Sequence, residues 1–201
     1  MPGPGEQLAA RLAAHVGDAR VLAAVRDVPR DRFVPPELRD EAWENVPLPI
    51  GEGQTISQPL VVARMCELLA LSGDERVLDV GTGSGYHAAL LARLVRHVWS
   101  IEVHASLSAR ARENLAAAGV DNVTLIVGDG AAGLEEVAPF DAINVAAACR
   151  DVPPALQRQL ADGGRLVAPV GGHEQRLVLL RRHGDRVERR QLERVRFVPF
   201  T

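Results

Sequence analysis

The chain contains no lysine, only two cysteines and no long hydrophobic run. All 23 basic residues are therefore arginines, but they are spread among nearby acids, and the net charge is −3. This pattern predicts neither a nucleic-acid-binding nor a membrane-binding surface, and we interpret the arginine preference as a compositional habit of the source genome. No stretch reaches the ~18 apolar residues of a membrane span, and the N-terminal residues lack the apolar core of a signal peptide.

The two cysteines, Cys66 and Cys149, lie far apart in a chain without a recognisable secretory segment. We therefore expect free thiols in a reducing, cytoplasmic compartment. The six histidines show no metal-ligand spacing, so no metal is expected. A length of 201 residues with a hydrophobic share of 47% predicts one domain with a sizeable core, which we expect to be a monomer.

Residues 1–59 differ in pattern from the rest of the chain. Apolar residues at helical spacing predict two short helices, interrupted near Gly17. Prolines crowd the segment 29–59, so it is expected to be a long loop rather than a regular helix or a central strand. Because apolar residues anchor this loop, we expect it to be ordered and to cover a substrate site.

Residues 60–201 alternate between helical patterns and short β-branched runs. The predicted helices span 60–71, 86–95, 105–119 and 152–163, and the predicted strands span 76–81, 97–103, 122–129, 140–148 and 164–171. Such alternation predicts an α/β fold with a Rossmann-like, doubly wound, mostly parallel sheet. Period-two runs at 175–182 and 185–200 predict that antiparallel strands complete the sheet.

The segment "DVGTGSGY", residues 79–86, joins the first of these strands to a helix. Gly81, Gly83 and Gly85 permit a tight turn and a close backbone approach to a ligand. Glu102 ends the next strand, 21 residues beyond Gly81, where a carboxylate can accept hydrogen bonds from two ribose hydroxyls. A nucleoside-bearing ligand is predicted. Tyr86 replaces the third glycine of the dinucleotide fingerprint, which disfavours NAD.

The segment "VLDVGTGSGY" resembles the first motif of class I methyltransferases, which bind S-adenosylmethionine, and "IE" at 101–102 resembles their second. Asp129, in "VGDG" at a strand end, is suitably placed for the adenine amino group. Asp79 is expected to hold either the methionine part of the cofactor or the turn itself. The predicted cofactor-binding residues are Asp79, Gly81, Thr82, Gly83, Ser84, Gly85, Tyr86, Glu102, Asp129 and Gly130.

Several further segments, from residue 25 to residue 200, resemble the protein-L-isoaspartate O-methyltransferase family. They include "VPRDRFVP", "PLPIGEGQTISQP", "GDGAAG", "LADGGRLVAPVG" and "RFVPF". The resemblance implies methyl transfer from S-adenosyl-L-methionine to the α-carboxyl of L-isoaspartyl residues in damaged proteins and peptides, with S-adenosyl-L-homocysteine as product. It also implies repair, because the ester closes spontaneously to a succinimide whose hydrolysis returns part of the material to aspartate.

The active-site serine of that family corresponds to Ser57, with Thr55 and Gln58 beside it. We expect these side chains to orient the substrate carboxylate, which is itself the nucleophile. The alternative is that the three residues only cap the helix beginning near Leu60.

Departures from the family pattern leave two other functions open. Trp43, Leu60 and the stretch "AAACRDVP" are expected to flank the peptide cleft. They would suit an enzyme that methylates an ordinary aspartate in a biosynthetic precursor peptide. A non-catalytic nucleoside-binding module is the second alternative, against which the retention of Ser57, Glu102 and Asp129 argues. Cys149 and Arg150 follow a strand but receive no role.

Overall fold

A seven-stranded mixed sheet runs through the molecule in the order β5-β4-β3-β6-β7-β8-β9. The structure is a computed structural model that describes residues 1–200 of the chain. The strands are β3 (Arg76–Val80), β4 (His97–Glu102), β5 (Val123–Val127), β6 (Phe140–Val145), β7 (Leu160–Gly171), β8 (Gln175–His183) and β9 (Arg186–Val195). The first five are mutually parallel, whereas β8 is antiparallel to β7, and β9 is antiparallel to β8. This arrangement confirms the predicted α/β class and its antiparallel end.

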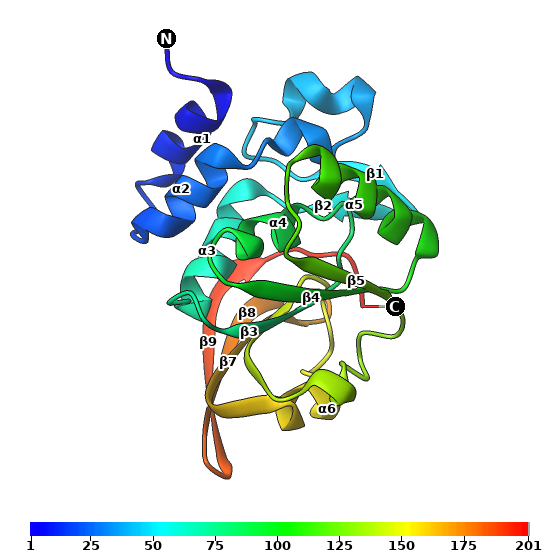
Figure 1. The fold of residues 1–201 in the computed structure, drawn as a ribbon. Coiled ribbons are helices and arrows are strands. Elements are labelled where there is room, and N and C mark those ends of the chain that lie inside the picture. Colours follow the sequence, from blue (N-terminus) through cyan, green and yellow to red (C-terminus); the bar gives the residue numbers. More distant parts are fainter. Residues whose placement is uncertain (201) are drawn as a thin grey trace.

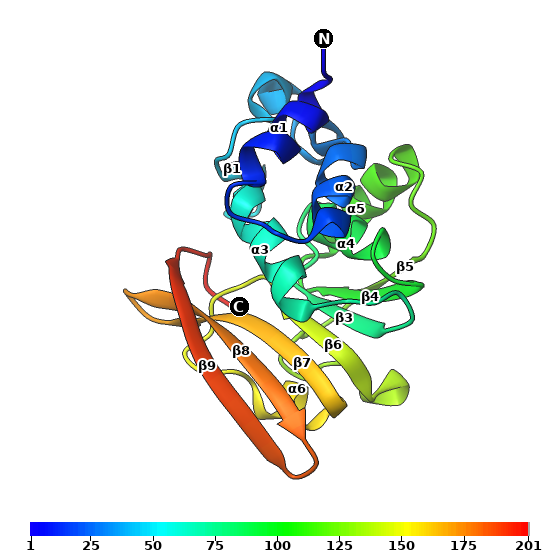
Figure 2. The ribbon, with the colours of Figure 1, turned by 90° about the vertical axis from the view of Figure 1, so that its left-hand side faces the viewer.

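Helices cover both faces of this sheet (Figures 1 and 2). On one face lie α3 (Pro59–Leu69), α4 (Tyr86–Ala92) and α5 (Ala105–Ala117), while α6 (Pro154–Arg158) packs on the other. The first two helices, α1 (Pro4–Leu12) and α2 (Ala19–Asp27), form a pair that packs through α2 against α3. Every residue of α4 is buried, because this helix lies between the sheet and its neighbouring helices.

The strand order opens a crevice at the carboxyl ends of β3 and β6. From the central β3 the chain moves outward through β4 and β5, and then returns to the other side of β3 as β6. The connection after β3 leads to one side of the sheet, towards β4, and β6 lies on the other side of β3. Open α/β sheets bind ligands at the point where the strand order reverses in this way. Gly81 and Ala146 directly follow β3 and β6, and the Ala146 N–H donates to Val80 O at 2.8 Å.

The proline-rich segment 29–59 is more regular than the sequence predicts. It contains the 3₁₀ helices η1 (Arg30–Phe33) and η2 (Pro36–Glu41) and a hairpin of β1 (Leu48–Gly51) and β2 (Gln54–Ile56). The expectation of a loop was wrong because the prolines hide the strand pattern and occupy positions that a short hairpin tolerates. Arg110 of α5 donates to Ile50 O at 2.6 Å, which fixes the hairpin beside the helical face.

The predicted helix 152–163 was too long. The helix α6 ends at Arg158, and Leu160 already belongs to β7, where it pairs with Phe140 of β6. Leu160 is fully buried, so tertiary packing at the sheet overrides the local helical pattern.

Candidate active site

The glycine turn between β3 and α4 lies in the crevice. Gly81, Gly83 and Gly85 have φ values of 94°, 55° and 90°, a region that L side chains rarely adopt. The N–H groups of Gly81 and Thr82 donate to Ile101 O at 2.9 and 3.2 Å. The turn is therefore held against β4.

Glu102 ends β4 and faces the same turn. Its Oε2 accepts a hydrogen bond from Gly83 N at 2.8 Å, and its Oε1 accepts one from His104 N at 2.9 Å. The residue is only 5% exposed. Each carboxylate oxygen has a further lone pair, so Glu102 can still accept hydrogen bonds from two ligand hydroxyls.

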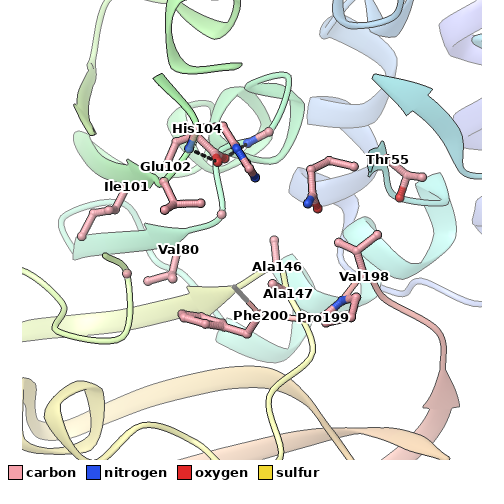
Figure 3. Close-up of a pocket in the computed structure, with 15 residues that line it drawn as sticks. Thr55, Val80, Ile101, Glu102, His104, Ala146, Ala147, Val198, Pro199 and Phe200 are labelled. Atoms are coloured by element: carbon pink, nitrogen blue, oxygen red, sulfur yellow. Dashed lines mark hydrogen bonds between the residues drawn. The ribbon is translucent and has the colours of Figure 1, made fainter. Parts of the chain in front are cut away.

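The first cavity adjoins Glu102 and encloses about 540 Å³, including its opening to solvent (Figure 3). Polar and apolar atoms share its walls, and Glu102 lies across it from Thr55 and Val198. The lining residues are Gln54, Thr55, Val80, Gly81, Gly83, Ile101, Glu102, Val103, His104, Gly130, Ala146, Ala147, Val198, Pro199 and Phe200. A cavity with both apolar side chains and one carboxylate suits a nucleoside, whose base is flat and whose sugar carries hydroxyls.

The second cavity lies on the other side of the glycine turn. It is lined by Thr55, Ile56, Ser57, Val62, Gly81, Thr82, Gly83, Ser84, Tyr86, His87 and Ala146. Thr55, Gly81, Gly83 and Ala146 line both cavities, so the two adjoin at the turn. The hairpin β1–β2 thus brings Ser57 beside the predicted cofactor turn.

A buried polar network lies beneath the turn. Asp79 accepts hydrogen bonds from Ser100 Oγ and Asn144 Nδ2, both at 2.7 Å, and Ser100 Oγ lies 2.6 Å from Thr82 Oγ1. Burial raises the pKa of Asp79 to about 6, although both hydrogen bonds act in the opposite direction. Asp79 lines neither cavity and reaches the turn only through Ser100 and Thr82.

His87 belongs to the same network but also lines the second cavity. Its Nδ1 lies 3.1 Å from Asn144 Nδ2, which also donates to Asp79, so His87 Nδ1 accepts and the ring proton resides on Nε2. Burial lowers the pKa of His87 to about 3. The ring is consequently neutral at pH 7.

Ser57 does not cap the helix α3. The N-cap residue of α3 is Gln58, which makes no side-chain capping bond, and the Leu60 N–H instead donates to Asn45 Oδ1 at 2.9 Å. Among residues 1–200, Ser57 Oγ has no hydrogen-bond partner, whereas Ser57 O accepts from Arg30 Nη2 at 3.2 Å. The capping alternative is therefore wrong for Ser57, and its hydroxyl is free to bind a ligand.

An outer groove extends from Ser57 towards the surface. Pro47, Thr55, Ser57, Gln58 and Val61 form one side, and residues 194–197, at the end of β9 and just beyond it, form the other. Gln58 lines only this groove, whereas Thr55 lines the groove and both cavities. The three predicted carboxylate-orienting residues therefore lie in one connected region.

The predicted cofactor residues differ in their positions. Gly130 lines the first cavity, and a Cβ there would overlap Val80 Cγ1, so only glycine fits. Asp129 is exposed, accepts from Ala131 N at 2.8 Å and does not line the cavity. Thr82, Ser84 and Tyr86 line the second cavity instead of the first, and Gly85 lines neither.

The sequence reasoning missed one wall of the first cavity. Val198, Pro199 and Phe200 run beside Ala148, whose N–H donates to Val198 O at 2.8 Å and whose carbonyl accepts from Phe200 N at 2.8 Å. The available signal was compositional, since the chain has only four phenylalanines and two of them fall in "RFVPF". His104 was also missed as a lining residue, and its buried Nε2 has no partner among residues 1–200.

The family departures differ in their positions. Of the stretch "AAACRDVP", Ala146 and Ala147 line the first cavity. Trp43 and Leu60 pack against the hydrophobic core and line neither cavity nor the groove, and their expected place beside the peptide cleft stays a prediction. Cys149 is buried and donates its N–H to Pro169 O, and Arg150 is exposed; neither lines these hollows.

Among residues 1–200, no group of three or more His, Cys, Asp or Glu residues is arranged to hold a metal ion. Within the same residues, no helix is long and apolar enough to cross a membrane.

Comparisons with known proteins agree with this geometry. The family model for protein-L-isoaspartate(D-aspartate) O-methyltransferase matches residues 6–201. A protein-L-isoaspartate O-methyltransferase of Halorhodospira halophila is 58% identical over 187 residues, which cover 92% of this chain and 85% of the relative. The enzyme of Anaeromyxobacter dehalogenans is 56% identical, with 93% of this chain and 92% of the relative covered.

Two solved structures share the fold. A protein-L-isoaspartate O-methyltransferase superposes with a TM-score of 0.88 at 27% identity and covers 96% of this chain, which spans 65% of that one. A Plasmodium falciparum protein of the same description, solved with S-adenosyl-L-homocysteine, gives 0.85 at 24% identity, with 98% of each chain covered. From its motifs, its fold and its close relatives, the chain belongs to the protein-L-isoaspartate(D-aspartate) O-methyltransferase family.

Proposed function

We propose that the chain transfers a methyl group from S-adenosyl-L-methionine to the α-carboxyl group of L-isoaspartyl residues in proteins and peptides. Family membership supports the activity, because two relatives named for it are more than half identical over most of the chain. The observation that carries the proposal is the contact of the two cavities at Thr55 and the glycine turn, with Ser57 lining the second.

The first cavity fits the nucleoside part of the cofactor. Glu102 offers free lone pairs to the ribose hydroxyls, and Val80, Gly130 and Phe200 line the same cavity, where they would pack against the base. When bound, S-adenosyl-L-methionine supplies an electrophilic methyl group, and S-adenosyl-L-homocysteine remains after its transfer.

The residues of the second cavity act on the acceptor. A carboxylate is ionised at neutral pH and needs no general base, so the neutral His87 is consistent with the reaction. The Ser57 hydroxyl and Thr55 would donate hydrogen bonds that fix the carboxylate oxygens. Alignment of this kind contributes about 7 kcal/mol or more to a two-reactant step.

The product ester would close to a succinimide, and hydrolysis of that ring returns part of the material to aspartate. We accordingly expect a repair role on damaged proteins. The cytoplasmic location and the monomeric state are separate expectations, and they remain predictions from the sequence. The region 1–59 would cover the substrate, because its hairpin contributes Thr55 and leads directly into Ser57.

The first experiment compares two peptides that differ only in an L-isoaspartyl or an L-aspartyl residue, with labelled S-adenosyl-L-methionine as methyl donor. Base-labile label on the isoaspartyl peptide alone supports the proposal. Label on the aspartyl peptide would instead favour an enzyme that modifies a precursor peptide. If neither peptide is labelled while the cofactor still binds, the result favours a non-catalytic binding module.

Two variants connect the activity to the site. Ser57→Ala should lower kcat at least tenfold while binding of S-adenosyl-L-homocysteine stays within twofold, because Ser57 lies outside the first cavity. Ser106→Ala is the matched control, since this exposed hydroxyl on α5 donates to Glu52 and lines neither cavity.

A further inference from the structure

The outer groove has a charge pattern that the proposed reaction does not explain. Its charged lining residues are Arg194 and Arg196, both exposed, and the groove wall contains no acid. The same groove contains Ser57 and Thr55, so a chain whose carboxylate reaches Ser57 would pass these two arginines.

Nearby acids neutralise this charge only weakly. Arg194 Nη2 lies 3.7 Å from Glu174 Oε2, but the side chains are 68% and 75% exposed, so the pair is strongly screened by water. Glu193 is bound to Arg64, with Nε–Oε1 at 3.1 Å, and Arg196 has no ion-pair partner among residues 1–200. The rim is therefore electropositive.

The backbone beneath Arg196 is firmly placed. The Phe197 N–H donates to Gln175 Oε1 at 2.7 Å, and Gln175 Nε2 donates back to Phe197 O at 3.2 Å. Phe197 is buried, and the chain then continues into the wall of the first cavity. A charge on a fixed backbone loses less entropy on binding than one on a mobile segment.

We propose that the outer groove binds the peptide segment that flanks the isoaspartyl residue and selects acidic side chains in it through Arg194 and Arg196. This inference rests on the proposed function. Arginine is suited to the task because its planar guanidinium can bind a carboxylate through two parallel hydrogen bonds. The acids that the groove selects would lie close to the methylated residue in the peptide, because Ser57 and the two arginines line the same groove.

The test uses three isoaspartyl peptides that are identical except that the flanking positions carry Glu, Gln or Lys. Glu side chains of the peptide would form exposed ion pairs with Arg194 and Arg196. We therefore expect kcat/KM to be about fivefold higher for the Glu peptide than for the Gln peptide, and lowest for the Lys peptide. The order should collapse in about 0.5 M salt, because exposed charges are then screened.

Variants locate the effect. In Arg194→Gln/Arg196→Gln the ratio of kcat/KM between the Glu and Gln peptides should fall towards one. Arg186→Gln is the matched control, because this exposed arginine lies on the same strand eight residues from Arg194, about 27 Å away along β9. It should leave the ratio unchanged.

The outcomes separate the two proposals. Equal methylation of the Glu and Gln peptides, or a preference that survives the double substitution, overturns the groove assignment and leaves the methyltransferase activity standing. Failure of all three peptides while S-adenosyl-L-homocysteine still binds overturns the proposed function and the groove assignment with it.

Discussion

Arg30 is buried without a carboxylate partner, which makes its replacement a sensitive test of how Ser57 is positioned. Its guanidinium donates to the carbonyls of Ala42, Val46 and Ser57, the last two at 3.0 and 3.2 Å, and at 3.4 Å to the carbonyl of Glu44. It also lies over the Tyr86 ring, 5.7 Å from the centroid. One side chain therefore joins η1, the loop before β1 and the segment that leads into α3.

The magnitude follows from these contacts. Arg30→Met would leave its three closest carbonyls without their donor, at about 1–3 kcal/mol each. Burial lowers the pKa of Arg30 to about 10, and removal of this unpaired charge offsets about 3 kcal/mol. The free energy of unfolding should therefore fall by about 3 kcal/mol. Because a displacement of about 1 Å can cost a hundredfold in rate, kcat should fall by about that factor.

The assay pairs urea unfolding with methyl transfer and binding of S-adenosyl-L-homocysteine. Arg30→Lys should show an intermediate loss of stability, since an ammonium can reach fewer of the carbonyls. Arg39→Met, at an exposed arginine of η2, is the control. A stability loss below about 1 kcal/mol, or a kcat within twofold of the parent at a temperature where the variant is folded, would refute the reasoning.

Three further predictions concern cofactor binding and acid stability. Gly130→Ala should weaken S-adenosyl-L-homocysteine binding at least tenfold by calorimetry, because the added Cβ overlaps Val80; unchanged affinity would place the base elsewhere. Glu102→Gln should weaken the same binding about tenfold, since a charged acceptor is lost, and an effect below twofold would contradict a ribose contact. Burial alone would raise the pKa of Glu75, but hydrogen bonds from Ser72 and Gly73 outweigh it and lower the pKa to about 2. The stability that Glu75 contributes, about 2 kcal/mol after allowance for screening, is thus present above its unfolded pKa and lost as pH falls from about 4.5 to 2. Glu75→Gln should remove this dependence in acid unfolding curves, and a parallel pH profile would refute it.

The sequence predicts the α/β core well, because its signals are local. Alternating β-branched runs and helical spacings place β3 to β6 and the helices between them, and the glycine turn and Glu102 follow from residue type and spacing. The Ser57 segment required a family resemblance, since "GQTISQP" has no periodicity that would bring it to the carboxyl end of β3.

The remainder depends on contacts that are distant in sequence. The hairpin β1–β2 is fixed by Arg110 from α5, and the start of β7 by pairing with β6. Asp129 lies two residues beyond the end of β5 and does not end a strand as predicted, and its carboxylate turns to a local backbone N–H at Ala131. Two backbone hydrogen bonds attach the wall at 198–200 to Ala148, 50 residues earlier in the chain.

The two halves of the site belong to separate hydrogen-bonded sheets. The glycine turn and Glu102 are carried by the seven-stranded sheet, whereas Thr55 and the approach to Ser57 are carried by the two-stranded hairpin. Within residues 1–200 no strand pairing links the two sheets, so acceptor choice can diverge through substitutions in the hairpin while the cofactor residues stay unchanged. This modular construction allows one methyl-donor scaffold to acquire new acceptors during evolution without rebuilding its core.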